Sequence, residues 1–178
     1  MTYVALLRGI NVGGNNKIDM KTLKAVFEAA GMASVRTYIN SGNVIFTCDT
    51  GTHATIAEML GSAIEQQFGI TVPVLIRDVN ELRSIVQALP ASWANDAAAK
   101  CDVVFLWPEV DTPETLRALN IDPEIEDARY TPGAILRRVT RKNATRSRLT
   151  RIVGTPLYSQ VTLRNCTTAR KLLVLMTE

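Results

Sequence analysis

The sequence predicts an α+β protein built from two tandem ferredoxin-like (split βαβ, alpha-beta plait) units with antiparallel sheets. Residues 1–78 give the order strand, helix, strand, strand, helix, strand, which defines the split βαβ unit. A similar order returns later in the chain, without a readable sequence repeat. We therefore expect a first unit over 1–78, a linking helix and connector over 79–100, and a second unit with a C-terminal helix over 101–178.

The strands of the first unit have the characters that this order requires. Residues 2–7 are almost continuously apolar, which is typical of a central strand. Residues 35–39 alternate between apolar and polar, and the run 72–76 contains Pro73, so both are expected at sheet edges. The strand 44–46 returns from a tight turn at 40–43 and completes the sheet.

Capping signals predict where the helices of the first half begin. Asp19 precedes an apolar helical stripe that ends before Gly31. Thr55 and Glu58 form a possible capping box for a helix that reaches Phe68. Asp78 and Glu81 are expected to cap the linking helix, which Pro90 stops.

The second half repeats the pattern with shorter elements. Ser147 is expected to cap its second helix, and Asn165 or Thr167 its last one. In chain order, the predicted elements are a buried strand 103–107, a short helix opened by Thr112 and Pro113, strands 128–130 and 134–139, a helix carrying Leu149, Ile152 and Val153, an edge strand around 161–163, and a closing helix with Leu172, Leu173, Leu175 and Met176.

Composition is that of an ordinary globular protein, with 47% hydrophobic and 21% charged residues among 178. No apolar run approaches the roughly 20 residues of a membrane span, and the N-terminus lacks the features of a signal peptide. Cys48, Cys101 and Cys166 are far apart and without CxxC spacing, so we expect reduced thiols. These observations predict a cytoplasmic protein with no membrane partner.

Charge is segregated along the chain. The segment 131–178 carries ten Lys and Arg residues against Glu178 alone, whereas the segment 109–127 is acidic. Such a basic segment indicates either an anionic partner or pairing with residues 109–127 of the same chain.

One group of polar residues, here called the Asn/Gly cluster, is expected to gather at one end of the first sheet. The topology brings together the loop 8–17, the turn 40–43 and the exit from the second helix at 69–71. Amides, basic side chains and glycine backbone could seat an anion or nucleotide, although turn residues of this kind also serve loop geometry alone. The spacing of its glycines matches neither GxGxxG nor a Walker loop. The candidate ligand-binding residues are Arg8, Asn11, Gly13, Gly14, Lys17, Asn40, Ser41 and Asn43.

A second group, here called the basic patch, is expected at one end of the second sheet. There the loop after the third strand meets the exit of the fourth. Phosphate contacts are the expected use, and a solvated charged face or pairing with 109–127 is the alternative. The candidate anion or nucleic-acid residues are Arg141, Lys142, Arg146, Arg148, Arg164, Asn165, Thr168 and Lys171.

Familiar catalytic and metal-binding signatures are missing from the sequence. His53 is the only histidine, and we expect it to be exposed to solvent. No set of His, Cys and carboxylate residues has metal-ligand spacing, so the sequence predicts no metal and no cofactor. Whether the chain is an enzyme stays open.

Several long motifs resemble a bacterial family known as domain of unknown function 1697. They are Ala5-Leu6-Leu7-Arg8-Gly9-Ile10-Asn11-Val12-Gly13-Gly14, Tyr38-Ile39-Asn40-Ser41-Gly42-Asn43-Val44, Val74-Leu75-Ile76-Arg77, Arg146-Ser147-Arg148-Leu149-Thr150 and the segment 162–172. The resemblance implies two ferredoxin-like subdomains and no established activity. The family usually has Trp at position 166 and Val at 169, where this chain has Cys166 and Ala169.

Three hypotheses about function follow. The first is binding of a phosphate-bearing ligand, either a nucleotide or a nucleic acid, by the basic patch and the Asn/Gly cluster. The second is an enzyme acting on a small anionic substrate, with Arg8, Asn11, Asn40 and Ser41 orienting it. The third is a non-catalytic interaction module in which both groups only shape loops.

Overall fold

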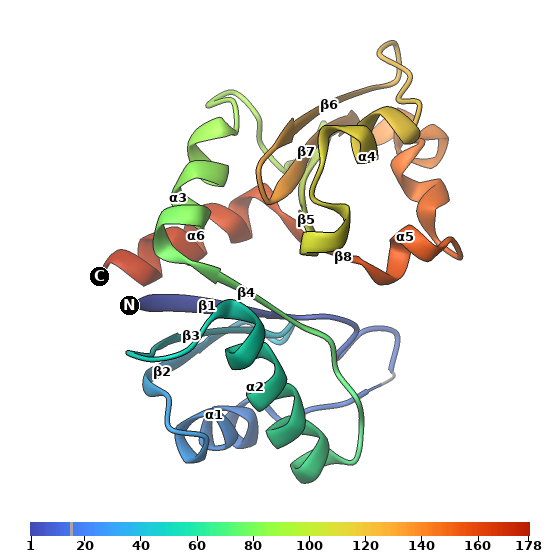
Figure 1. Cartoon of the computed structure of the whole chain (residues 1–178). Coiled ribbons are helices and arrows are strands. Elements are labelled where there is room, and N and C mark those ends of the chain that lie inside the picture. The colour runs from blue at the N-terminus through green and yellow to red at the C-terminus, as the bar shows by residue number, and fades with distance from the viewer. Residues whose placement is uncertain (15) are drawn as a thin grey trace. The chain divides into compact units, whose positions relative to one another are not determined.

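The computed structural model describes residues 1–14 and 16–178. The chain forms two compact units, Met1–Leu82 with Leu172–Glu178, and Arg83–Lys171 (Figure 1). The sequence-based division at 78 and 100 gave the whole C-terminal helix to the second unit, whereas here its last residues belong to the first. Asn15, part of the predicted loop 8–17, lies outside the described residues.

The first unit has the predicted ferredoxin-like fold. Its four-stranded antiparallel sheet has the order β2-β3-β1-β4, so the alternating strand and the strand after Pro73 lie at the two edges, as expected. Its elements are β1 (Thr2–Leu7), α1 (Met20–Ala29), β2 (Ala33–Tyr38), β3 (Asn43–Thr47), α2 (His53–Phe68) and β4 (Val74–Asp78), followed by α3 (Val79–Ala88), which crosses into the second unit.

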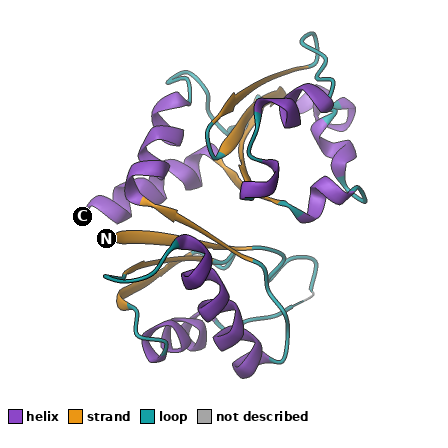
Figure 2. Cartoon of the chain, viewed as in Figure 1, coloured by secondary structure: helices purple, strands orange, loops and turns teal. Residues whose placement is uncertain are grey.

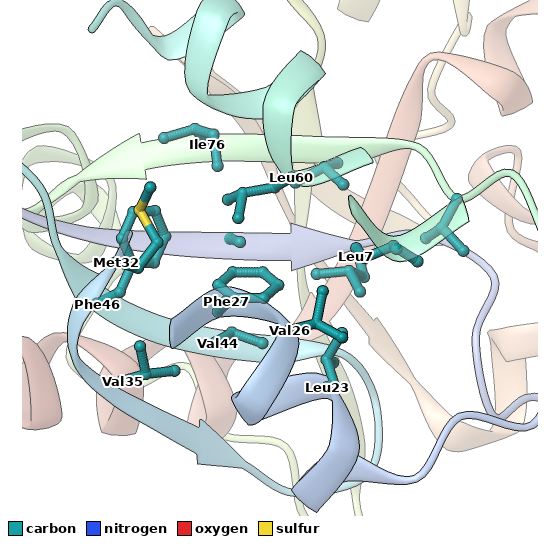
Figure 3. Packing of buried hydrophobic residues seen from close by; sticks show 14 of the residues in the cluster. Leu7, Leu23, Val26, Phe27, Met32, Val35, Val44, Phe46, Leu60 and Ile76 are labelled. Carbon is teal, nitrogen blue, oxygen red and sulfur yellow. The ribbon is translucent and has the colours of Figure 1, made fainter. Parts of the chain in front are cut away.

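The core of the first unit lies between its sheet and the two helices α1 and α2. Phe27 of α1 is fully buried and meets Phe46 of β3 edge to face, with ring centroids 5.7 Å apart. Leu60 of α2 is also fully buried, and Figure 3 shows it beside Ile76 of β4. The apolar faces predicted from helical spacing are therefore the faces that pack on the sheet.

Helix caps of the first unit agree with the sequence at two of three positions. The Asp19 carboxylate accepts a hydrogen bond from the N–H of Thr22 at 2.7 Å. Asp78 and Glu81 cap α3, as expected. The predicted Thr55–Glu58 capping box is wrong, because α2 begins earlier and Thr52 forms the box with Thr55.

The second unit also has the predicted fold (Figure 2). Its antiparallel sheet has the order β6-β7-β5-β8, which repeats the arrangement of the first. Its elements are β5 (Ala99–Leu106), the 3₁₀ turn η1 (Pro108–Val110), α4 (Pro113–Ala118), β6 (Glu126–Thr131), β7 (Ala134–Thr140), the 3₁₀ segments η2 (Arg141–Arg146) and η3 (Leu149–Ile152), α5 (Pro156–Ser159) and β8 (Val161–Asn165), followed by α6 (Cys166–Thr177).

The helix predicted after Ser147 is instead broken into η3 and α5. Ser147 does not cap it, because its hydroxyl donates a hydrogen bond to the Glu126 carboxylate at 2.5 Å. The apolar residues of this segment are nevertheless used as expected. Leu149 and Ile152 are buried in a cluster with Val104 and Ile135 of the sheet.

The last helix, α6, begins at the predicted cap. The side-chain oxygen of Asn165 accepts a hydrogen bond from the N–H of Thr168 at 2.8 Å. All three cysteines are free thiols, and Cys101 and Cys166 are buried. Within residues 1–14 and 16–178, no helix is long and apolar enough to cross a membrane.

Candidate anion-binding site

A pocket of about 420 Å³ opens at one end of the second sheet. We call it the basic pocket. Four of its lining residues are basic and one is acidic. The full set is Asn95, Lys100, Asp102, Arg137, Arg141, Leu163, Arg164 and Asn165.

Strand register sets the floor of the basic pocket. Asp102 of β5 lies opposite Arg137 of β7 on one side and opposite Asn165 of β8 on the other. Directly opposed residues of antiparallel strands share a face, so these three side chains form a row across the sheet. Lys100 lies on the same face because side chains alternate along a strand.

Arg137 is the central cation of this row. Its side chain is 5% exposed, and Nη1 donates to Asp102 at 2.8 Å while Nε donates to Glu126 at 3.1 Å. Its third nitrogen, Nη2, is buried and has no hydrogen-bond partner among the described residues. Within the described part of the chain, one donor of this buried cation is thus left unsatisfied.

Glu126 holds the loop after β7 against β6. Its side chain is fully buried, and besides Arg137 it accepts hydrogen bonds from the Ser147 hydroxyl and from the Arg148 N–H at 2.6 Å. One member of the acidic segment 109–127 is thus paired with the basic segment. This pairing supports the alternative that part of the basic segment pairs with residues 109–127 of the same chain. The charge partner is the Arg137 side chain, whereas Arg148 contributes only its backbone N–H.

The electrostatics of the basic pocket follow from burial. Loss of hydration raises the pKa of Asp102, although Arg137, Lys100 and Arg141 act in the opposite direction. Of these three cations, Arg137 bonds directly to Asp102, and Lys100 and Arg141 line the same pocket. Burial also lowers the pKa of Arg164 to about 10, which still leaves it charged at neutral pH.

Two hydrogen bonds, one from its backbone and one from its side chain, position Arg141. Its N–H donates to the carbonyl of Ala98 at 2.9 Å, and its side-chain Nε donates to the carbonyl of Asp96 at 3.0 Å. The residue as a whole is exposed. Arg141 is thus held at the rim of the basic pocket.

The predicted basic patch is only partly gathered at this place. Arg141, Arg164 and Asn165 line the basic pocket, which joins the two predicted segments. Lys142 and Arg146 are exposed on η2 and do not line it, and Arg148 lines a separate hollow with Arg151. Thr168 is buried behind the Asn165 cap, and Lys171 is half-buried farther along α6.

The Asn/Gly cluster of the first unit is held together by its own hydrogen bonds. The Asn11 amide donates to the carbonyls of Ile18 at 3.0 Å and Asn40 at 2.9 Å, and its oxygen accepts from the Ile18 N–H at 2.8 Å. The N–H of Arg8 donates to the carbonyl of Pro73 at 3.0 Å. The Asn11 amide therefore joins the loop 8–17 to the turn 40–43, and Arg8 bonds to the chain just beyond the third predicted segment, 69–71.

Other members of the Asn/Gly cluster are divided between the interior and the surface. Asn43 is fully buried and donates to the carbonyl of Tyr38 and to the hydroxyl of Ser41. Gly13, Gly14 and Lys17 are exposed. A ligand-binding role for this cluster stays a prediction.

His53 differs from the expectation of a freely exposed side chain. It is half-buried and packs edge to face on Tyr3, with ring centroids 5.7 Å apart. Its two ring nitrogens face the carboxylates of Asp78 and Glu81.

Sequence reasoning missed Lys100, Asp102 and Arg137 as parts of a site. Lys100 fell in the predicted connector 79–100 and Asp102 just before the predicted strand, because the apolar run that marked the strand begins at Val103. The strand in fact begins at Ala99, and its alternation of Lys100 and Asp102 with buried Ala99 and Cys101 was the available signal.

Comparison with known proteins supports the fold and gives no activity. The sequence model of a family described as "Protein of unknown function (DUF1697)" matches residues 1–135. A solved structure, the conserved bacterial protein SP0830 from Streptococcus pneumoniae, is similar to this chain with a TM-score of 0.82 and 25% sequence identity, over 98% of each chain. Comparison with curated proteins gives no match.

Proposed function

The chain belongs to the DUF1697 family of proteins of unknown function, and we propose that it binds a small phosphate-bearing ligand in the basic pocket of its second unit. The observation that carries this proposal is the charge of the pocket. Lys100, Arg137 and Arg141 line it against Asp102. The side chain of Arg164 lies on the opposite face of the sheet, because Arg164 pairs with Val103 rather than with Asp102, and it is not counted here. Even when the buried partner Glu126 is counted, positive charge is in excess.

Phosphate is an anion that these donors suit. Guanidinium groups form paired hydrogen bonds with phosphate oxygens, and lysine adds a compact charge. Asn95 and Asn165 also line the basic pocket and supply neutral amide groups. Amides of this kind can recognise the uncharged part of a ligand.

The size of the basic pocket favours a small molecule. Its volume of about 420 Å³ is within the range of roughly 300–1,000 Å³ that is usual for small-ligand sites. A mononucleotide is of suitable size, whereas a nucleic-acid duplex would have to bind mainly through the exposed residues outside the pocket. We therefore favour the nucleotide over the nucleic acid.

Arg137 contributes a fixed framework to the proposed site rather than its excess charge. It is nearly inaccessible and is offset by Asp102 and Glu126, so the excess of positive charge comes from Lys100 and Arg141. The paired carboxylates fix its guanidinium before a ligand arrives, which lowers the ordering cost of binding. Arg137 would then act as a fixed support, with Lys100 and Arg141 making the direct contacts.

The proposal is tested by titrating the full chain with AMP and with inorganic phosphate in a calorimeter at low salt. We expect Lys100→Met and Arg141→Met each to weaken AMP binding by roughly 10-fold, since each removes a charge-assisted contact. Lys142→Met is the matched control, because Lys142 adjoins Arg141 and does not line the pocket. Its affinity should equal that of the wild type.

Two results would overturn the proposal. One is AMP affinity that none of the pocket variants changes. The other is binding of a single-stranded oligonucleotide, without binding of AMP, that is lost by roughly 0.2 M salt and depends on Lys142 and Arg146 rather than on Arg141. The second result would move the function to the exposed part of the basic patch.

A further inference from the structure

Three metal-ligating side chains lie together in the first unit, away from the basic pocket. His53 begins α2, Asp78 ends β4 and Glu81 lies in the first turn of α3. One ligand atom from each lies within 4.8 Å of the other two. Nε2 of His53 is 3.7 Å from Oδ2 of Asp78, and Nδ1 is 3.7 Å from Oε2 of Glu81.

Backbone hydrogen bonds hold both carboxylates in place. Oδ1 of Asp78 accepts from the N–H groups of Asn80 at 2.8 Å and Glu81 at 2.9 Å, and Oε2 of Glu81 accepts from the Asp78 N–H at 2.9 Å. A carboxylate has about four lone-pair sites, so these bonds leave acceptor capacity on each group. Ligands that are fixed in advance lower the cost of binding an ion.

The imidazole is held as well, and the group remains accessible. Tyr3 packs its ring against His53 at an interplanar angle of 88°. The side chains of His53, Asp78 and Glu81 are 38%, 19% and 39% exposed, so an ion can reach them and keep water ligands.

We propose that His53, Asp78 and Glu81 bind a divalent first-row transition metal ion such as Zn²⁺. One imidazole nitrogen with two carboxylate oxygens suits these ions, whereas Mg²⁺ and Ca²⁺ prefer oxygen ligands throughout. Bonds of about 2.0–2.2 Å place neighbouring ligand atoms roughly 3.0–3.5 Å apart. The ion would bind one of the two ring nitrogens. The three ligand atoms now lie within 4.8 Å of one another, so they would have to approach by roughly 1 Å to reach that geometry.

The spacing in the sequence concealed this group. His53 is 25 positions before Asp78. The three residues come together because β4 ends, and α2 and α3 both begin, at the same edge of the sheet. The N-termini of both helices carry partial positive charge, which opposes a cation. We therefore expect weaker binding than at a zinc site built from thiolates.

The ordinary structural explanation of these residues is a helix cap with a histidine beside it. Asp78→Asn and Glu81→Gln separate that explanation from the proposed site. Asn is as good an N-cap as Asp, and Gln can replace Glu in a capping box, so both variants keep the cap while they lose a charged ligand. Their thermal unfolding without metal should stay close to that of the wild type.

The test is a calorimetric titration of the untagged full chain with Zn²⁺ near neutral pH. We expect one ion per chain in the wild type, no binding in His53→Ala, and affinity lowered by roughly 10-fold or more in Asp78→Asn and Glu81→Gln. Glu58→Gln is the matched control, because Glu58 is an exposed carboxylate on the same helix as His53. It should bind Zn²⁺ as the wild type does.

Several outcomes would overturn the proposal. They are a wild-type chain that binds no Zn²⁺, a His53→Ala chain that binds it with unchanged affinity, and Asp78→Asn and Glu81→Gln chains that both bind as the wild type. A Co²⁺-loaded chain whose absorption spectrum shows thiolate charge transfer would also overturn it, since that result would place the ion on a cysteine.

Discussion

At the scale of single residues, the Asn11 side chain joins two loops of the first unit. It makes hydrogen bonds with the backbone of both Ile18 and Asn40. Asn11 also has a positive φ of 53°, a conformation that asparagine tolerates better than most residues. Backbone geometry and hydrogen bonding thus both account for asparagine at this position, without a ligand.

We predict that Asn11→Ala lowers the free energy of unfolding by about 1–2 kcal/mol, because it leaves partly buried backbone groups without partners. Urea unfolding followed by circular dichroism measures the change. Lys17→Ala, in the same loop and exposed, should have no measurable effect. An Asn11→Ala chain as stable as the wild type would show that these hydrogen bonds contribute nothing.

Asp102 gives a second prediction at this scale, concerning pH. Burial raises its pKa in the folded chain, so protonation of Asp102 favours the folded state. That stabilisation is complete below the ordinary Asp pKa of about 3.9 and is lost as the pH rises through the raised value. Asp102→Asn does not titrate.

We therefore expect the stability of Asp102→Asn, relative to the wild type, to increase as the pH rises from about 4 towards neutrality. Urea unfolding of both chains at several pH values measures this difference. A difference that is independent of pH would mean that the pKa of Asp102 is the same in the folded and unfolded chains.

At the scale of secondary-structure elements, Glu126 fastens the 3₁₀ segments of the second unit to the sheet. It lies on β6, and its carboxylate meets Arg137 of β7 together with Ser147 and Arg148 between η2 and η3. Hydrogen bonds with this carboxylate occupy the residues that would otherwise begin a regular helix. The same carboxylate therefore helps to explain why this region departs from the predicted helix.

We predict that Glu126→Gln destabilises the protein by about 3 kcal/mol or more, because it leaves the buried Arg137 with one fewer charged partner. Asp127→Asn is the control, since the neighbouring Asp127 pairs with Arg129 at the surface, and it should cost far less. Equilibrium unfolding of both variants gives the comparison. Equal losses in the two variants would contradict a special role for Glu126.

At the scale of the whole molecule, much of the fold could be predicted because local signals and topology agree. Pro73 and the alternation in residues 35–39 identified the two edge strands of the first sheet, and the observed strand order places both there. The segments that follow β7 and β8 were also expected to meet, and Arg141 and Asn165 do line one pocket.

The candidate sites could be predicted less well, because they depend on contacts across the sheet. Arg137 looked like one more cation of a basic segment, and only strand register places it between Asp102 and Glu126. His53 looked solitary in the sequence, whereas the fold brings Asp78 and Glu81 to it. Pairings of this kind leave no local pattern in the sequence.

The central claim is that the basic pocket, rather than the Asn/Gly cluster, holds a phosphate-bearing ligand. A crystal structure of the full chain grown with AMP tests it most directly. We predict the phosphate group in the basic pocket, with oxygens about 2.7–3.0 Å from the side-chain nitrogens of Lys100 and Arg141. AMP ordered beside Asn11 and Asn40, or a basic pocket without phosphate in such crystals, would contradict it.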